Sequence, residues 1–375
     1  MKYYIIAGEA SGDLHGSNLI KEIKKLDPAA AIRCWGGQLM KDAGGELVKD
    51  YKDLAFMGFA EVIGNLPTIL RNIKFCKSDI EKFHPDALIL IDYPGFNIRI
   101  AQWAHQKKFK VIYYISPQVW AWKESRVKTI RECVDKMLVI LPFEKDFYRK
   151  WNYEVEYVGH PLVQVIEDFK NKSAQGAVPS LQFEKPVIAI LPGSRKQEIL
   201  KKLPVMLEAS RAFPDNQFVL AQAPGQDESF YAELIRNYPD VRCVKNQTYA
   251  LLLQAKAACV TSGTATLETA LFGVPEVICY RGSSLSYQIA KRLIRVKYIS
   301  LVNLIMDKPI VTELIQDELT VRNLVDELKA LLTDTKRQEQ IRTDFSELRH
   351  KLSLGGHASA NAAKSIIEFL KPSVS

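Results

Sequence analysis

Residues 257–280 read AACVTSGTATLETALFGVPEVICY, and this stretch indicates the fold of the whole chain. Its apolar first part predicts a buried strand that ends near Thr261. A tight turn of small residues follows at Ser262-Gly263-Thr264, and then a helix over residues 265–272 and a second strand. A strand, a turn, a helix and another strand in succession are typical of a parallel α/β sheet.

The turn at residues 262–264 is suited to hold a diphosphate. Its backbone N–H groups and two hydroxyls lie at the positive end of the helix dipole, with no bulky side chain beside them. Glu268 lies one helical turn beyond Thr264, where its carboxylate could accept hydrogen bonds from the hydroxyls of a ribose. An ordinary N-cap, with Ser262 or Thr264 as the capping residue and Glu268 in solvent, explains the same pattern equally well.

The composition is that of a globular protein drawn to anionic partners. A chain of 375 residues favours two domains of about 150 to 200 residues each. Hydrophobic residues make up 47% and charged residues 25%, which excludes a disordered chain. The net charge of +8 favours nucleic acid, membrane phospholipid or a phosphorylated substrate as the partner. Since the sequence has no Lys/Arg block, zinc-finger spacing or aromatic RNA-binding signature, we expect no nucleic-acid partner.

The cysteines and the apolar runs indicate the cellular compartment of the protein. No two cysteines have the spacing of metal ligands, so we expect reduced core residues of a cytosolic protein. No apolar run approaches the roughly 18 residues of a membrane-spanning helix, so we expect a chain that is neither exported nor transmembrane. The six cysteines are Cys34, Cys76, Cys133, Cys243, Cys259 and Cys279.

Strand-like runs alternate with helical segments in two series, which predicts an α/β protein with two doubly wound, Rossmann-like domains. The first series of runs is Tyr3–Ala7, Ile32–Trp35, Ala87–Ile91, Val111–Ile115, Lys136–Ile140 and Val155–Val158. The second is Val187–Leu191, Gln217–Ala221, Val241–Val244, Ala257–Thr261 and Glu276–Cys279. We expect the two domains to face each other across a cleft, where the strand-end loops of open α/β sheets bind ligands.

A polar segment at 169–186, which contains Gly and Pro but no periodicity, predicts the linker between the domains. We therefore expect an N-terminal domain over 1–168 and a C-terminal domain over 187–345. The chain after Val321 is predicted to be helical, with breaks near Thr333 and at Gly355-Gly356. The last helical segment, 346–375, could pack back on the N-terminal domain, and the sequence does not decide this.

In the first half, ionisable residues follow two strands. GEASGDLHG, residues 8–16, brings Glu9 and Asp13 to the end of the first strand. It lacks the G-x-G-x-x-G spacing of a dinucleotide site, and no acid ends the second strand, so we do not expect NAD. Asp92 follows the strand at 87–91, where it is placed to act as a general base, and a plain N-cap or Asx-turn is an equal alternative.

Two further loops of the first half could touch a sugar or a phosphate. SPQVWAWKESR, residues 116–126, places Trp120 and Trp122 beside cations, although a packed loop is slightly favoured. His160 follows the last strand of this half, where a ligand contact and a structural turn are equal alternatives.

In the second half, Gly193 and Ser194 form a small turn and Arg195 adds a fixed positive charge. Together they could stabilise a departing diphosphate. No Asp-x-Asp motif occurs in the chain, so the sequence does not support a glycosyltransferase site built on a chelated metal.

Residues 56–83 combine an unusually apolar series with Arg71, Lys74, Lys77 and Lys82. Apolar surface with a basic edge is typical of a protein that binds an anionic membrane. The residues alone favour a pair of core helices over this alternative.

Taken together, these motifs resemble lipid-A-disaccharide synthase, a family with the glycosyltransferase-B fold. They span both predicted domains in order, from residue 8 to about residue 305. The matching motifs are GEASGD at Gly8, MGFAEVIG at Met57, IDYPGFN at Ile91, SPQVWAW at Ser116, LPFEKDFY at Leu141, GHP at Gly159, LPGSR at Leu191, SGTATLE at Ser262 and YISLVNLI at Tyr298.

The resemblance implies an inverting, metal-independent glycosyltransferase of lipid A and lipopolysaccharide biosynthesis in Gram-negative bacteria. It implies transfer of diacylglucosamine from UDP-2,3-diacylglucosamine to the 6-hydroxyl of 2,3-diacylglucosamine 1-phosphate (lipid X), giving a β-1,6 disaccharide and UDP. It implies no cofactor, and a cytoplasmic protein bound peripherally to the inner face of the inner membrane. The oligomeric state and the preferred acyl-chain length stay open.

The resemblance also implies the catalytic residue and the membrane contact, and the residue patterns described above add the UDP-sugar site. Asp92 matches the catalytic aspartate, and Gly95 stands where many relatives carry a second acid, whose role is absent here or is taken over by Glu9 or Asp13. The expected UDP-sugar site is Gly193, Ser194, Arg195, Ser262, Gly263, Thr264, Glu268, Tyr280 and Asn303. The expected membrane and acyl-chain contacts are Phe59, Val62, Ile63, Leu66, Ile69, Leu70 and Ile73, which reverses the preference for a core pair.

Two rival functions remain at this point. One is another enzyme of the same fold, such as a UDP-N-acetylglucosamine 2-epimerase or a peptidoglycan-type N-acetylglucosaminyl transferase. The apolar and basic stretch after Phe56 argues against a soluble epimerase. The other rival is a non-catalytic module that binds a nucleotide sugar and does not depend on Asp92.

Overall fold

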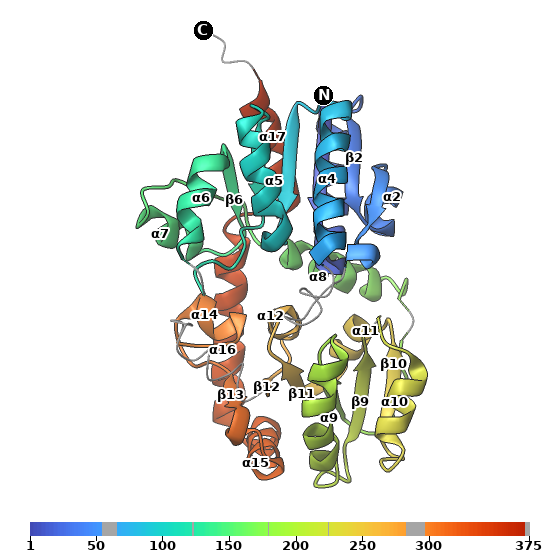
Figure 1. The fold of residues 1–375 in the computed structure, drawn as a ribbon. Helices are drawn as coiled ribbons and strands as arrows, with labels where there is room; N and C mark the ends of the chain where they lie inside the picture. The colour runs from blue at the N-terminus through green and yellow to red at the C-terminus, as the bar shows by residue number, and fades with distance from the viewer. Residues whose placement is uncertain (55–65, 122–123, 179, 224, 283–296, 372–375) are drawn as a thin grey trace. The chain divides into compact units, whose positions relative to one another are not determined.

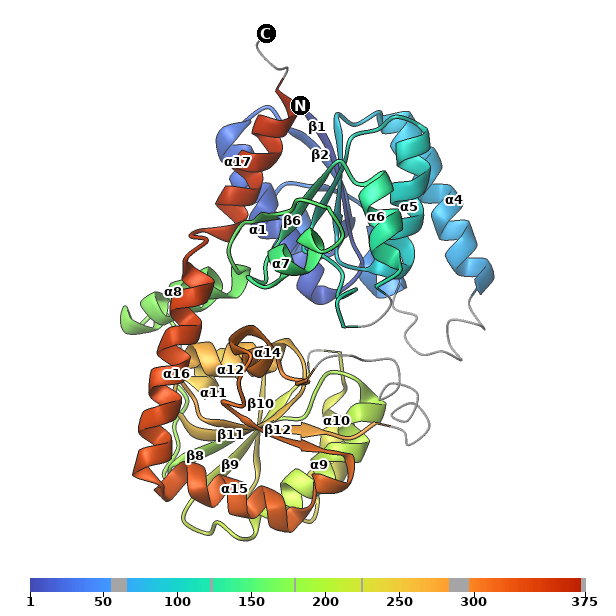
Figure 2. The same cartoon turned by 90° about the vertical axis from the view of Figure 1, so that its left-hand side faces the viewer.

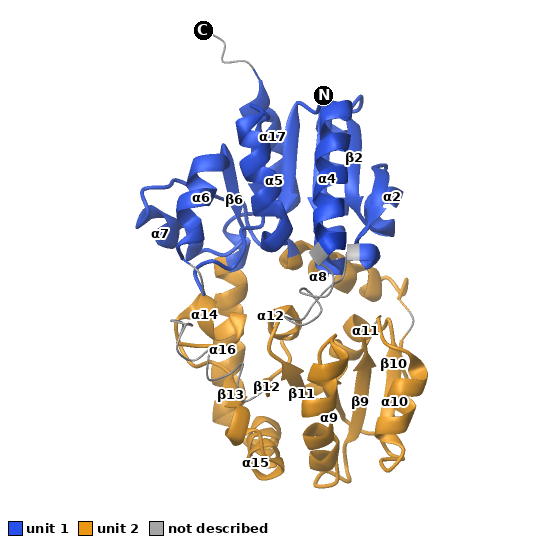
Figure 3. Ribbon diagram, viewed as in Figure 1, with its two compact units in different colours: residues 1–161, 352–375 blue, residues 162–351 orange. Residues whose placement is uncertain are grey.

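The apolar runs form two parallel sheets in the computed structural model, which describes residues 1–54, 66–121, 124–178, 180–223, 225–282 and 297–371. Each sheet belongs to its own compact unit (Figure 3). Unit 1 comprises Met1–Pro161 and Leu352–Ser375, and unit 2 comprises Leu162–Lys351. Helices cover both faces of each sheet (Figures 1 and 2). The predicted α/β class, with two doubly wound Rossmann-like domains and a helical C-terminus, is confirmed.

The sheet of unit 1 has seven strands in the order β3-β2-β1-β4-β5-β6-β7. The strands are β1 (Lys2–Ala7), β2 (Ala31–Gly36), β3 (Glu46–Asp50), β4 (Ala87–Ile91), β5 (Val111–Tyr114), β6 (Lys136–Val139) and β7 (Glu156–Tyr157). The helices are α1 (Ala10–Leu26), α2 (Gln38–Asp42), α4 (Leu66–Phe83), α5 (Pro94–Gln106), α6 (Arg126–Cys133), α7 (Glu144–Arg149) and α17 (Ala358–Leu370). The central strands β1 and β4 are unbroken apolar runs because helices cover them on both faces.

The C-terminal helix α17 belongs to unit 1, where it packs against α1. The Asn361 side chain donates a hydrogen bond of 3.1 Å to the carbonyl of Val158, just after β7. The hydroxyl of Tyr157 donates one of 3.2 Å to the carbonyl of Leu352. The end of the chain is therefore tied to the edge of the first sheet.

The sheet of unit 2 has six strands in the order β10-β9-β8-β11-β12-β13. They are β8 (Val187–Leu191), β9 (Gln217–Gln222), β10 (Arg242–Lys245), β11 (Ala255–Thr261), β12 (Glu276–Tyr280) and β13 (Thr312–Ile315). The helices are α8 (Pro161–Ala174), α9 (Lys196–Ser210), α10 (Glu228–Ile235), α11 (Thr248–Leu252), α12 (Thr264–Phe272), α14 (Leu301–Met306), α15 (Val321–Thr333) and α16 (Thr335–Ser353). The helix breaks expected near Thr333 and at Gly355-Gly356 are confirmed.

The division between the units falls at Pro161, earlier than the expected domain end at residue 168. Helix α8 runs into the segment expected to be a linker, and its contacts lie in unit 2. The Lys170 ammonium donates a hydrogen bond of 2.9 Å to the carbonyl of Leu271, and the Phe169 ring packs on Tyr249. The first half of α8 buries Leu162, Val163 and Ile166, whereas its last part, residues 169–174, is mostly polar and has no buried side chain, so this part of the helix carries no apolar periodicity.

Among the helices that the structure describes, none is both long and apolar enough to cross a bilayer.

Candidate functional site

In unit 1, the loops after β1 and β4 lie next to each other. The two strands pair in parallel, with Ala7 opposite Ile91, so the residues that follow them emerge at the same edge of the sheet. The ring of Tyr93 lies directly over Gly8, where an added Cβ would come within 2.3 Å of the ring. Glycine at position 8 is therefore what allows the two loops to approach.

Asp92 occupies a strained turn that the buried core holds in place. Asp92 and Tyr93 have φ values of 44° and 49°, two successive left-handed residues of the kind that cluster at functional sites. The carbonyl of Asp92 accepts hydrogen bonds from the Asn97 side chain at 2.8 Å and the Tyr113 hydroxyl at 2.5 Å. Its N–H donates to the carbonyl of Ile115 at 3.2 Å. These three contacts fix the backbone through the main-chain atoms of Asp92. They do not use the oxygens of its carboxyl group.

Burial raises the pKa of Asp92 to about 7, and the negative charge of Glu9 adds to the shift, while the N–H of Tyr93 opposes it. Glu9 is the N-cap residue of α1. A carboxylate with a pKa near the working pH is a stronger base than an exposed aspartate, and a large share of it is still ionised. The arrangement can accept a proton from a substrate hydroxyl.

Asp13 has a different role in the structure. Its side chain is 3% exposed and accepts hydrogen bonds from the N–H groups of Gly37 at 2.8 Å, Leu39 at 3.2 Å and Met40 at 3.0 Å. These groups lie at the start of α2, where backbone N–H groups need an acceptor. The geometry therefore shows Asp13 holding the loop after β2. Gly95 is exposed, and an added Cβ there would meet no described atom within 4 Å.

The histidines of this region are buried. Burial lowers the pKa of His15 to about 4 and that of His160 to about 3, so both rings are neutral at pH 7. A neutral ring does not supply positive charge to a phosphate, which favours the structural alternative for His160. Trp120 is also buried, at 7% exposure, whereas Trp122 lies outside the described residues.

In unit 2, the loops after β8 and β11 are neighbours because Leu191 pairs with Val260. Gly193 has a φ of 104°, a left-handed conformation that favours glycine. Arg195 is the N-cap residue of α9, and its guanidinium lies 3.2 Å from the carboxylate of Glu198. Ser194 is joined to the neighbouring loop through its carbonyl, which accepts a hydrogen bond of 3.1 Å from Gln226.

Among the described residues, no side chain caps the N-terminus of α12. Its N-cap residue is Gly263, without a capping hydrogen bond, and the Ser262 hydroxyl instead donates to the carbonyl of Ile299 at 2.9 Å. Gly263 and Thr264 are both exposed. The ordinary N-cap alternative is therefore wrong, and the first N–H groups of the helix are positioned to bind an anion.

Glu268 is not simply solvated. Its carboxylate is half-buried and accepts a hydrogen bond of 2.8 Å from the hydroxyl of Tyr249. Burial raises the pKa of Glu268, and the Tyr249 hydrogen bond opposes the shift. This contact uses one carboxylate oxygen and orients the group at the first turns of α12.

Asn303 lies in α14, and Tyr280 is the last residue of β12. The Asn303 amide is 1% exposed, and it donates to the carbonyl of Val311 at 2.9 Å and to Glu313 at 3.0 Å. Its oxygen accepts hydrogen bonds from the N–H groups of Ile310 and Val311. Asn303 thus holds the loop before β13, while Tyr280 ends β12 and is partly exposed.

The expected membrane contacts are only partly described. Phe59, Val62 and Ile63 lie outside the described residues, as does the side chain of Leu66. Farther along α4, Ile73 is 7% exposed and belongs to the core of unit 1, and Ile69 packs partly against that core. Leu70 is 56% exposed and Phe75 is 47% exposed, beside the exposed Arg71 and Lys74. Among the described side chains of α4, Leu70 and Phe75 are the large apolar ones that are exposed.

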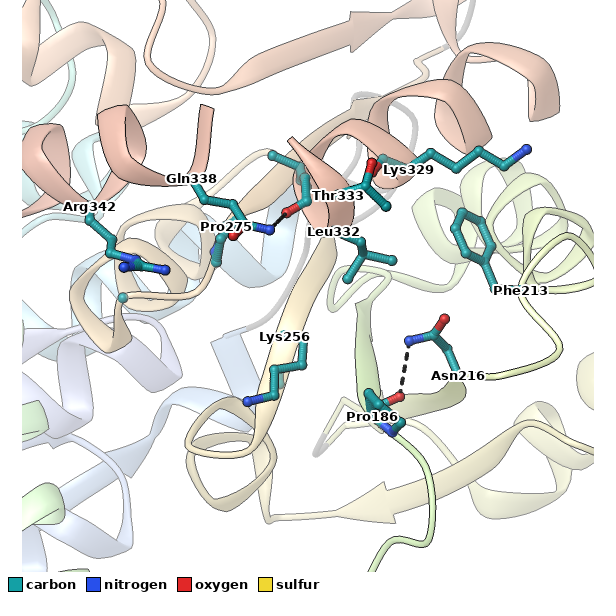
Figure 4. Close-up of a pocket in the computed structure, with 13 residues that line it drawn as sticks. Pro186, Phe213, Asn216, Lys256, Pro275, Lys329, Leu332, Thr333, Gln338 and Arg342 are labelled. Carbon is teal, nitrogen blue, oxygen red and sulfur yellow. Dashed lines mark hydrogen bonds between the residues drawn. The ribbon is translucent and has the colours of Figure 1, made fainter. Parts of the chain in front are cut away.

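A cavity of about 590 Å³ lies elsewhere in unit 2. Figure 4 shows the residues that line it. Pro186, Ala255 and Pro275 line it at the amino ends of β8, β11 and β12, and Lys329 and Arg342 come from α15 and α16. The candidate site residues follow the carboxyl ends of these strands, so the cavity is separate from them. Within the described ranges, no group of three or more His, Cys, Asp or Glu side chains is placed to hold a metal ion.

The geometry also reveals buried ionisable residues that the sequence analysis does not single out, and Glu144 and Lys202 are two of them. Glu144 in α7 is 1% exposed, and its carboxylate accepts a hydrogen bond of 2.9 Å from the N–H of Leu141. Lys202 in α9 is 2% exposed and lies near Glu198. Neither has a sequence signal, because a charged residue inside a helical pattern is normally on the exposed face.

Comparisons with known proteins support one family. Residues 3–367 match the family described as lipid-A-disaccharide synthetase. Lipid-A-disaccharide synthase of Syntrophus aciditrophicus (strain SB) is 41% identical over 375 residues, which cover 98% of each chain. Lipid-A-disaccharide synthase of Geobacter metallireducens (strain ATCC 53774 / DSM 7210 / GS-15) is 40% identical over 371 residues, covering 98% of this chain and 96% of that one.

Solved structures share the fold at low sequence identity. A UDP-GlcNAc 2-epimerase from Neisseria meningitidis bound to UDP-GlcNAc aligns with a TM-score of 0.68 at 14% identity, covering 99% of both chains. The glycotransferase of kitacinnamycin aligns with a TM-score of 0.69 at 16% identity, also covering 99% of both. At such identities the likeness supports the glycosyltransferase-B fold and nothing finer.

Proposed function

Because the chain belongs to the lipid-A-disaccharide synthase family and is a glycosyltransferase of lipid A biosynthesis, we propose a specific reaction and a role for each candidate residue. The donor is UDP-2,3-diacylglucosamine and the acceptor is 2,3-diacylglucosamine 1-phosphate. The acceptor's 6-hydroxyl oxygen attacks the anomeric carbon of the donor while the bond to UDP breaks. The anomeric centre inverts, and the products are the β-1,6 disaccharide and UDP.

Unit 1 supplies the base. Asp92 takes the proton of the 6-hydroxyl as the new bond forms, and its raised pKa is the observation that best supports this role. Burial is the main cause of this raised pKa, and the negative charge of Glu9 adds to it. Asp13 does not act on the substrate itself. Its carboxylate accepts hydrogen bonds from the N–H groups of Gly37, Leu39 and Met40 and so holds the loop after β2.

Unit 2 binds the donor. The N–H groups at the start of α12 and the Arg195 guanidinium stabilise the negative charge that develops on the departing diphosphate. Glu268, oriented by Tyr249, accepts hydrogen bonds from the ribose hydroxyls. The remaining residues of the donor site are Gly193, Ser194, Ser262, Gly263, Thr264 and Tyr280. Asn303, which the sequence analysis also expects there, is buried and instead holds the loop before β13.

The decisive experiment is a turnover assay in the presence of EDTA. UDP release and disaccharide formation are followed from UDP-2,3-diacylglucosamine, with and without the lipid acceptor. We expect UDP release only when the acceptor is present. UDP binding without turnover would instead support the non-catalytic module, and conversion of the nucleotide sugar without an acceptor would support an epimerase.

We further propose that the protein binds the surface of an anionic membrane, through residues 59–70 and the exposed part of α4. The support is the exposed pair Leu70 and Phe75 beside Arg71 and Lys74. Acyl chains of both substrates would then stay partly in the bilayer during transfer.

The double substitution L70S/F75S should weaken binding to vesicles that contain phosphatidylglycerol by about tenfold, because two partly inserted apolar side chains are lost. The measurement is co-sedimentation with vesicles, together with a melting curve to confirm that the variant is folded. The matched control is L26S/L39S, which removes leucines of 54% and 45% exposure elsewhere in unit 1. Equal loss of binding in both variants would show that α4 is not the contact.

A further inference from the structure

Lys202 is a buried cation in unit 2. It lies in α9, close to Glu198 and therefore near the proposed donor site. Its side chain is 2% exposed, among the largest side chains in the described structure with so little exposure. Among the described residues, the one carboxylate within 4 Å of its ammonium is that of Glu198, at 3.9 Å. At that distance the Lys202 ammonium and the Glu198 carboxylate form an ion pair, but the ammonium does not donate a hydrogen bond to the carboxylate.

Burial of Lys202 is not explained by stability. An ammonium taken out of water loses several kcal/mol of hydration, and a distant partner restores only part of it. Burial lowers the pKa of Lys202, and the charge of Glu198 opposes that shift. A methionine or leucine of similar size would fill the same volume at no electrostatic cost. We therefore look for a functional reason why a charged residue occupies position 202.

Glu198 connects this cation to the candidate donor site. One of its carboxylate oxygens lies 3.2 Å from Arg195 and the other lies 3.9 Å from Lys202. The three residues form a row at spacings of three and four, on one face of α9. Exposure falls along the row, from 58% for the Arg195 side chain through 36% for Glu198 to 2% for Lys202.

Arg195 has two competing anions in this arrangement when a diphosphate arrives. If it turns to the diphosphate, Glu198 loses its partner at 3.2 Å and needs another cation. Lys202 already stands beside it and cannot leave, because the core encloses it. The buried ammonium therefore lowers the cost of releasing Arg195 from Glu198.

Building on the proposed donor site, we propose that Lys202 is a positioning residue for the donor diphosphate, acting through Glu198 to free the Arg195 guanidinium. It touches neither the diphosphate nor the reacting atoms. Its charge sets how readily Arg195 exchanges one anion for the other.

The test is a double-mutant cycle with UDP as the probe, measured by calorimetry. K202M should weaken UDP binding by about tenfold. Without the Lys202 charge, Glu198 has no second cation beside it, so the release of Arg195 to the diphosphate costs more free energy. E198Q removes the competing anion and should strengthen UDP binding severalfold. In the E198Q background, K202M should have no further effect on UDP binding.

In steady-state assays K202M should raise KM for the UDP-sugar and leave kcat near its original value, which general loosening of the fold would not do.

The matched control is K201M, which removes the same charge from the neighbouring exposed position and should leave UDP binding unchanged. If K202M does not melt cooperatively, K202Q serves the same test. Unchanged UDP binding in the Lys202 variant, or an equal loss with and without E198Q, would overturn the inference. R195A separates this result from the donor site itself: if R195A binds UDP normally, the proposed diphosphate role of Arg195 fails, whatever Lys202 does.

Discussion

Replacing Asp92 with Asn should lower turnover by about three orders of magnitude, the scale expected for a lost general base. UDP binding should stay near its original affinity. An amide has almost the shape of the carboxylate but does not accept the proton of the attacking hydroxyl. Asparagine also tolerates the left-handed backbone found at this position. The hydrogen bonds that hold the turn use the main chain of Asp92, so they survive the substitution.

The measurements are the rate of acceptor-dependent UDP release and the affinity for UDP. A matched control is D86N, at the opposite end of the same strand, where the side chain accepts a hydrogen bond from the N–H of Lys2. Asparagine can still accept that bond, so D86N should turn over normally. A near-normal rate for D92N would exclude Asp92 as the base.

The pH profile of the unmodified enzyme gives a second measure of the same assignment. The active form is the carboxylate, whose pKa is raised to about 7. Below pH 7, kcat/KM should therefore fall about tenfold per pH unit, and above it the profile should level off. Because the negative charge of Glu9 raises this pKa, E9Q should move the acidic limb to lower pH. A limb that moves to higher pH in E9Q would contradict the assignment.

The strands and most helices could be predicted because their signals are local. The runs at β4 and β8 are apolar throughout, and those at β1 and β11 are apolar apart from Lys2, Lys256 and Thr261, as is typical of central parallel strands. Strands β3 and β13 lie at sheet edges and carry charged residues, so they lack that signal, and the sequence analysis does not predict them. Helix α8 is missed in part for a similar reason, since its last residues, 169–174, are mostly polar and none of them is buried.

The site could be predicted only as far as sheet topology goes. Parallel pairing brings Glu9 near Asp92, and the loop at Arg195 near the start of α12, so residues that follow neighbouring strands meet. What each side chain does there depends on tertiary contacts. The bonds of Asp13 to the start of α2, those of Asn303 to the loop before β13, and the burial of Lys202 have no counterpart in spacing or composition.

Replacing Asp79 with Ala should destabilise unit 1 by about 3 kcal/mol, the lower end of the range for breaking a buried ion pair. Asp79 lies in α4 and is 7% exposed. Its carboxylate accepts hydrogen bonds from the Tyr4 hydroxyl at 2.7 Å and from Arg33 at 2.8 and 2.9 Å. The Tyr4 oxygen in turn accepts one of 2.8 Å from the Trp35 indole. Alanine leaves these groups of β1 and β2 without their acceptor.

The lower end of the range applies because Arg33 is partly exposed and also pairs with Glu46 at 2.6 Å. The measurement is the free energy of unfolding in urea. The matched control is E81A in the same helix, which removes an ion pair with Lys107 at 3.1 Å between side chains of 47% and 54% exposure. Such a surface pair contributes less than about 1 kcal/mol. If D79A and E81A unfold at the same urea concentration, the buried network does not anchor α4. In that case apolar packing, which includes Ile73, Cys76 and Ile80, is what holds α4 against the core of unit 1.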